Sequence, residues 1–175
     1  EESGKGDGTQ PALTGPQLMN DMLSLLPRDP LFIAGELHAK ITDKEENSKF
    51  KVEIWLNLGK SPAEARYVIR DTFGMALEQV ALTRKPNEAP TYKYFKGDPA
   101  KVAPMPDPST AIQNTNITWN DLILSFLWWR DATILGVEEV KGYDCFVVEV
   151  VEPKRDEAQK SSRKAKLWLT KEHRM

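Results

Sequence analysis

The chain has 175 residues, which is enough for one domain with a full hydrophobic core and fewer than most two-domain proteins contain. Hydrophobic residues make up 40% of the sequence and charged residues 29%. Positive and negative residues are interspersed, and the formal net charge is -2. This composition argues against a disordered chain and against a nucleic-acid-binding surface. The single cysteine, Cys145, excludes an internal disulfide and a cysteine-based metal cluster, and no apolar run reaches the roughly 18 residues of a membrane span.

The N-terminal residues 1–12 are predicted to form a flexible tail, because Glu1–Gln10 contain no large apolar side chain. A segment of this kind is what remains after a signal peptide has been removed, and a lipid anchor at this end is an open expectation. A short helix is predicted over Pro16–Leu26, where apolar residues recur at helical spacing. Pro27 and Pro30 then end the helix.

Alternation of apolar and polar residues predicts a meander of antiparallel strands in the next part of the chain. The predicted strands are Gly35–Thr42, Phe50–Leu58, Ala65–Thr72, Met75–Thr83 and Thr91–Lys96, with a polar turn at Asp43–Ser48. A long surface loop is predicted over Ala100–Asn116, because its three prolines and its polar residues cannot hold a regular strand ladder.

An aromatic amphipathic segment, Ile117–Arg130, is predicted to form a second helix. Thr118 can cap it, and Asp121 three residues later can return a hydrogen bond and complement the helix dipole. Seven large apolar side chains gather on one side of this helix, namely Trp119, Leu122, Ile123, Phe126, Leu127, Trp128 and Trp129. Three further strands are predicted over Ala132–Val140, Asp144–Glu152 and Ala165–Lys171, and a charged loop, Pro153–Lys164, precedes the last of them.

No motif in the sequence predicts catalysis. The two histidines, His38 and His173, do not stand beside cysteine or carboxylate residues at a metal-ligand spacing, and phosphate-binding and nucleophile motifs are missing. Adjacent carboxylates such as Glu138 and Glu139 point to opposite faces of a strand and are poor candidates for a shared acid and base. We therefore expect a protein that is not an enzyme and that has no metal site and no cofactor.

The oversized apolar helix face predicts either a solid core or a cavity for acyl chains. If helix and sheet pack closely they form a core, and if they are held apart they enclose an apolar cavity. Both alternatives stay open at the level of sequence. The candidate lining residues of the cavity are Leu37, Ile41, Val52, Ile54, Leu56, Tyr67, Trp119, Leu122, Ile123 and Phe126.

The segments ITWNDLILSFLWW, LGVEEVKGYDCFVVEVVEP and KAKLWLTKEHRM resemble the LolA-like superfamily of outer-membrane lipoprotein-sorting proteins, in its less characterised bacterial branch. The positions that carry this resemblance are Trp119, Asp121, Leu122, Gly136, Glu138, Gly142, Cys145, Phe146, Val147, Pro153 and Trp168. The resemblance implies an α+β fold, in which a curved antiparallel sheet forms an open, incomplete β-barrel covered by two short helices. We expect residues 13–175 to form one such domain, whose C-terminal part is truncated or shorter than in the family.

The resemblance further implies a periplasmic carrier or acceptor in a diderm bacterium. Such a protein binds lipid or lipoprotein acyl chains in its apolar cavity and transfers them toward the outer membrane. Candidate partners are an inner-membrane export complex and an outer-membrane acceptor, and we expect a monomer. The alternative is an envelope interaction module with a solid core, which docks a protein partner through a sheet edge or through the proline-rich loop.

Overall fold

The computed structural model of the protein describes residues 13–41, 47–85, 88–153 and 163–172. The predicted tail and most of the predicted Asp43–Ser48 turn and Pro153–Lys164 loop lie outside these residues. The chain divides into two compact units, and each is described by itself. We call them the six-stranded unit, residues 26–125, and the three-stranded unit, residues 1–25 and 126–175. The expectation of one domain over residues 13–175 stays a prediction.

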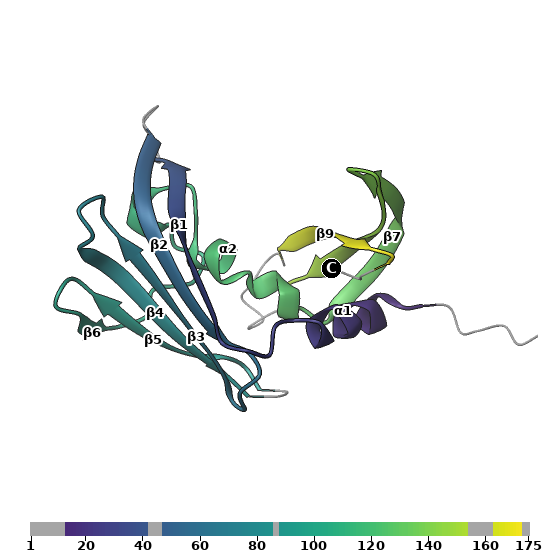
Figure 1. Ribbon diagram of the computed structural model, residues 1–175, viewed down its shortest axis with the longest axis horizontal. Helices are drawn as coiled ribbons and strands as arrows, with labels where there is room; N and C mark the ends of the chain where they lie inside the picture. The colour runs from purple at the N-terminus through teal and green to yellow at the C-terminus, as the bar shows by residue number, and fades with distance from the viewer. Residues whose placement is uncertain (1–12, 42–46, 86–87, 154–162, 173–175) are drawn as a thin grey trace, which may run out of the picture. The chain divides into compact units, whose positions relative to one another are not determined.

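The six-stranded unit is built on one antiparallel sheet whose strands follow one another in chain order (Figure 1). Its strands are β1 (Leu31–Lys40), β2 (Asn47–Asn57), β3 (Ala63–Arg70), β4 (Ala76–Arg84), β5 (Thr91–Lys96) and β6 (Lys101–Ala103). Each strand pairs with the next, as the alternating sequence pattern predicts for a meander. The sheet also carries a 3-10 helix, η1 (Ile112–Asn114), and the short helix α2 (Trp119–Ile123).

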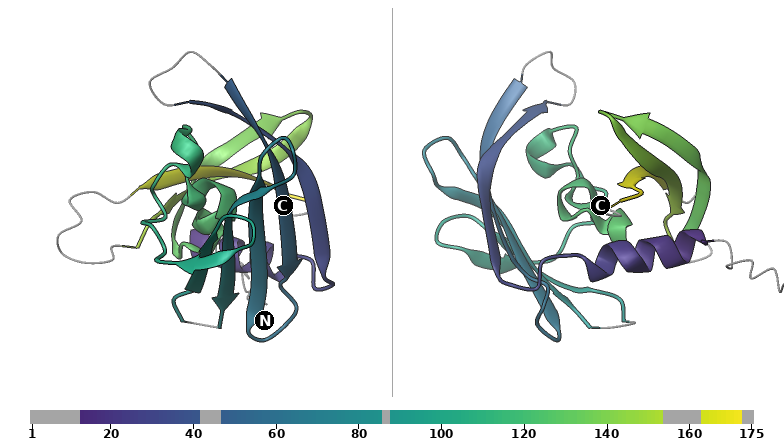
Figure 2. Two further views of the ribbon diagram at one scale, coloured as in Figure 1. Left: turned by 90° about the vertical axis from the view of Figure 1, so that its left-hand side faces the viewer. Right: turned by 45° about the vertical axis from the view of Figure 1, so that its right-hand side comes forward.

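The two faces of this sheet differ in what covers them. Side chains alternate between faces along each strand, so the register assigns every residue to one side. We call the face that carries η1 and α2 the inner face and the opposite one the outer face. The sheet is strongly bent, and α2 lies on its concave side (Figure 2). The inner face holds the hydrophobic core of the unit, whose buried members are Val52, Ala65, Tyr67, Ile69, Val80, Leu82, Tyr94, Ile112, Trp119 and Ile123.

The three-stranded unit combines helix α1 (Gly15–Ser24) with an antiparallel sheet of β7 (Asp131–Val140), β8 (Tyr143–Val151) and β9 (Lys164–Thr170). Leu18 and Met22 are buried on one side of α1, as the predicted helical spacing requires. Any other residue at position 15 would require a local shift, because a Cβ atom there would lie 2.1 Å from the carbonyl oxygen of Ala132 in β7. The helix therefore lies directly against the main chain of β7.

Several boundaries differ from the prediction. The second helix does not run to Arg130, because Leu124 adopts a left-handed conformation with φ of 52° and ends α2. A short 3-10 helix, η2 (Ser125–Trp128), follows it. Strand β1 begins at Leu31 rather than at Gly35, since Leu31 pairs with Leu56 of β2. The predicted loop at Ala100–Asn116 is also partly ordered, because β6 pairs with β5 and η1 follows.

The predicted α+β class with antiparallel sheets and two short α-helices is confirmed. In the part of the chain that the structure describes, no helix has both the length and the apolar character needed to cross a bilayer.

Candidate functional site

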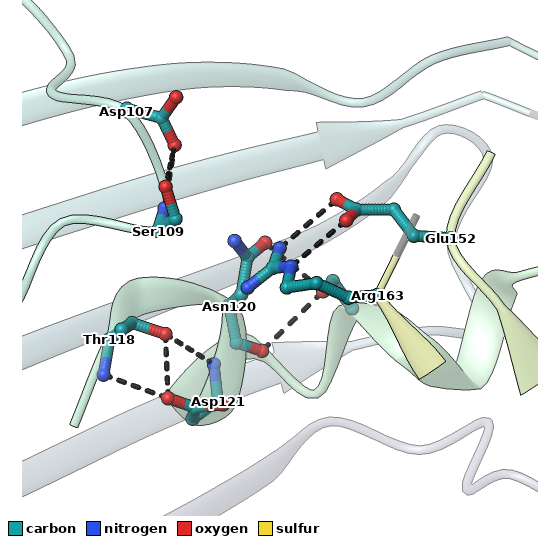
Figure 3. Close-up of polar contacts among 8 residues, drawn as sticks. Asp107, Ser109, Thr118, Asn120, Asp121, Glu152 and Arg163 are labelled. Carbon is teal, nitrogen blue, oxygen red and sulfur yellow. Dashed lines mark hydrogen bonds and ion pairs between the residues drawn. The ribbon is translucent and has the colours of Figure 1, made fainter. Parts of the chain in front are cut away.

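The start of α2 is fixed by the capping box that the sequence predicts. Asp121 N–H donates to Thr118 Oγ1 at 3.3 Å, and Asp121 Oδ2 accepts hydrogen bonds from Thr118 N–H at 2.9 Å and from Thr118 Oγ1 at 2.6 Å (Figure 3). The box leaves few unsatisfied donors at the first turn of this short helix. It also sets the direction in which Trp119, the first helical residue, enters the core.

Trp119 is the centre of the core beneath α2. Its side chain is only 1% exposed, and its ring meets that of Tyr94 in a T-shaped contact with centroids 6.2 Å apart. The Tyr94 hydroxyl donates to the buried Glu78 carboxylate at 2.5 Å, and the Gln113 amide of η1 donates to the same carboxylate. Burial and this hydrogen bond raise the pKa of Tyr94 above its ordinary value. The inner face under α2 is therefore tightly packed and tied to η1.

A second tyrosine on the inner face is also strongly desolvated. Burial, and after it the neighbouring Tyr92, raise the pKa of Tyr67 to about 12 against the opposing positive charge of Arg84. Burial lowers the pKa of the Arg84 guanidinium from its ordinary value. This part of the inner face therefore favours neutral, apolar groups.

On the inner face, apolar side chains of β1 and β2 reach solvent. Three cross-strand pairs lie there, Leu31 with Leu56, Ile33 with Ile54, and Leu37 with Phe50. We call these six residues the β1–β2 strip. Leu31 is 39% exposed and Ile33 is 44% exposed, and the other four are half-buried. Gly35 interrupts the strip opposite Val52, and a Cβ atom at Gly35 would have no neighbour within 4 Å. The strip is therefore an apolar track with an open gap in its middle.

The structure brings most of the predicted lining residues together on the inner face of the six-stranded unit. Val52, Tyr67, Trp119 and Ile123 are buried in the core, and Leu37, Ile54, Leu56 and Leu122 are half-buried and pack against it. Ile41 is half-buried just after β1, in a bridge with Thr115. Phe126 belongs to the three-stranded unit, where its ring contacts Trp129. The role of these ten residues as a cavity lining stays a prediction.

Sequence reasoning missed the exposed end of the strip and one aromatic residue on the outer face. Leu31 and Ile33 were missed because the predicted strand started at Gly35, although the alternation of Leu31, Ile33 and Leu37 could have revealed them. Trp55 lies on the polar side of the alternating strand β2, and an aromatic residue on that side is a signal in itself.

Comparison with known proteins shows that the fold of this chain is similar to that of two solved structures. No protein-family model matches the sequence, and the search of curated proteins gave no match. A crystal structure of a DUF1329 family protein from Desulfovibrio piger ATCC 29098 superposes with a TM-score of 0.65 at 14% identity, over 90% of this chain and 68% of that one. A domain from Vibrio parahaemolyticus, described as an outer membrane lipoprotein-sorting protein, gives a TM-score of 0.67 at 15% identity, over 91% of this chain and 67% of that one.

Such low identities carry information about the fold and not about individual residues. Both proteins are similar to this chain over most of its length. The chain therefore has the fold of these two proteins, as the resemblance stated from the sequence led us to expect.

Proposed function

We propose that this protein is a non-enzymatic carrier or acceptor of lipid or lipoprotein acyl chains in the periplasm of a diderm bacterium. In this proposal the bent sheet is part of an open, incomplete barrel, and the cargo is passed toward the outer membrane. The observation that carries the proposal is the β1–β2 strip, a solvent-accessible apolar track on the concave side of the sheet. The fold shared with a protein described as a lipoprotein-sorting domain supports the same function.

The strip has the chemistry that an acyl chain requires. Its side chains are those of leucine, isoleucine and phenylalanine, so they can exclude water from a chain without any polar group opposing it. Burying each methylene of the chain contributes about 0.8 kcal/mol, so a cargo lying along several residue pairs gains enough to leave water. The packing of Trp119 and Ile123 directs the cargo to the β1–β2 strip rather than beneath α2.

A fluorescent fatty acid without an aromatic ring, cis-parinaric acid, tests this proposal on protein from which bound lipid has been extracted. The matched variants are Ile33→Asp and Ala34→Asp, because these neighbours in β1 are both exposed but lie on the inner and the outer face respectively. We expect Ile33→Asp to weaken binding about tenfold or more, since a carboxylate replaces apolar contact surface. Ala34→Asp is expected to leave the affinity within about twofold, a change that corresponds to less than about 0.5 kcal/mol.

The same experiment can dismiss the carrier. If the parent protein does not bind the probe, or if both variants bind it as well as the parent does, the strip is not an acyl-chain site. Mass spectrometry of an organic extract of the purified protein gives an independent reading, because a carrier is expected to retain lipid from the cell.

An envelope interaction module with a solid core is the second candidate, and the packed residues around Trp119 favour it. Strand β1 is the edge of the six-stranded sheet, as strand addition would require. However, Asn116 covers the Lys40 end of this edge. Its main-chain N–H donates to the Lys40 carbonyl at 2.9 Å, and its side-chain oxygen accepts from Lys40 N–H at 3.1 Å. A partner strand would therefore pair with the Leu31 end of β1. Absence of acyl-chain binding together with intact folding would favour this candidate.

A further inference from the structure

A pocket of about 520 Å³ lies on the outer face of the six-stranded sheet. Its lining follows three consecutive rows of the register across β1 to β5, and the first is Phe32, Trp55, Arg66, Ala81 and Lys93. The third row is Asn57, Glu64, Thr83 and Thr91, and it points to the same face as the first. The row between them, from Leu31 to Tyr92, also belongs to the lining, and its side chains point to the inner face. Most of the lining side chains therefore lie on the face opposite the β1–β2 strip, of which Leu31 and Leu56 border the pocket.

The hollow arises from one small residue between large ones. Ala81 stands between Arg66 and Lys93 in the first row and has only a methyl group, so the longer side chains on either side form walls around it. Phe32 and Trp55 form the apolar end, with ring centroids 5.0 Å apart. Phe32 is 53% exposed and Trp55 37% exposed, so both rings present apolar surface to solvent.

The charged end of the pocket is cationic. The Arg66 guanidinium lies 5.6 Å from the centre of the Trp55 ring, and it donates a hydrogen bond to Gln79 at 2.5 Å. These two contacts hold the guanidinium in place while most of its five N–H donors remain for a ligand. Glu64 is the acidic member of the lining, and Lys60 pairs with it at 2.8 Å. Lys93 adds a second positive charge to that of Arg66.

We propose that this pocket binds an organic anion in which a flat apolar ring is joined to a carboxylate, sulfonate or phosphate group. The ring lies against Phe32 and Trp55, the anionic group is held by Arg66 and Lys93, and the hydroxyls of Thr83 and Thr91 accept or donate hydrogen bonds at the rim. The size of the pocket is in the range typical of small-molecule sites, and its mixture of aromatic surface and convergent polar groups is typical of them. This site is distinct from the proposed acyl-chain site.

Calorimetric titration with three compounds tests the assignment: 1-naphthyl phosphate, 1-naphthol and inorganic phosphate. We expect 1-naphthyl phosphate to bind at least about tenfold more tightly than either of the others, because only this compound uses both ends of the pocket. Its affinity is also expected to fall as the NaCl concentration rises. Equal affinities for 1-naphthyl phosphate and 1-naphthol, or no binding of 1-naphthyl phosphate, would overturn the proposal.

Variants locate the binding on the outer face. Ala81→Leu fills the hollow without changing any charge and is expected to abolish the binding of 1-naphthyl phosphate, while Arg66→Gln weakens it about tenfold. Lys51→Gln is the matched control, because Lys51 is an exposed cation on the same face outside the pocket, and it should leave the affinity unchanged. If Ile33→Asp weakens the binding and Ala81→Leu does not, the compound occupies the inner face and the proposal is wrong. Circular dichroism of each variant verifies its fold.

Discussion

Replacing Trp119 by alanine tests whether α2 belongs to a solid core. The side chain is 1% exposed and contacts the Tyr94 ring edge to face. A buried tryptophan removes about 150 to 250 Å² from water, and at about 25 cal/mol per Å² this corresponds to roughly 4 to 6 kcal/mol as an upper estimate. Substitutions of this kind cost about 3 to 5 kcal/mol in measured proteins. We therefore expect Trp119→Ala to lower the free energy of unfolding by about 3 to 5 kcal/mol.

The assay is urea denaturation followed by far-ultraviolet circular dichroism, because tryptophan fluorescence itself changes in the variant. Trp55→Ala is the matched control, since Trp55 is 37% exposed on the outer face, and its expected loss is below about 1.5 kcal/mol. If Trp119→Ala leaves too little folded protein, Trp119→Phe keeps an aromatic ring and is expected to lose about 1 to 2 kcal/mol. Equal losses for the two alanine variants would refute the view that the space beneath α2 is filled and that cargo must lie on the β1–β2 strip.

Two further predictions concern α1 and the inner-face tyrosines. Gly15→Ala should lower the free energy of unfolding by roughly 1 to 3 kcal/mol in chemical denaturation, because its Cβ would lie 2.1 Å from the Ala132 carbonyl oxygen, whereas Gly35→Ala meets no neighbour and should not destabilise the protein. A destabilisation of similar size in both variants would contradict this contact. The pKa of Tyr67, raised from 10.0 to about 12, favours the neutral phenol in the folded state, so its contribution is complete below pH 10 and is lost as the pH rises toward 12. By pH 11 this loss is about 1.4 kcal/mol, and Tyr67→Phe should show a correspondingly smaller decrease in stability between pH 8 and pH 11.

Local sequence patterns determined most of the secondary structure. The alternation of Phe50, Val52, Ile54 and Leu56 predicted both a strand and the side chains that share its apolar face, and the register of β2 agrees. The Thr118 capping box predicted the start of α2 correctly. These features depend on residues within a few positions of one another, so the chain carries their signals whatever its tertiary structure is.

Contacts between distant segments decided the rest. The start of β1 at Leu31 depends on its pairing with Leu56 of β2, and amphipathic periodicity alone began this strand too late and extended α2 past the left-handed Leu124. Sequence periodicity placed Trp119 and Leu37 on apolar faces without distinguishing them, because it reports which side chains share a face and not what covers that face. Packing against Tyr94 buried Trp119, while Leu37, on the edge strand, stayed half-buried. Sequence periodicity could not reveal the outer pocket either, since Ala81, Arg66 and Lys93 become neighbours only when three strands pair in this register.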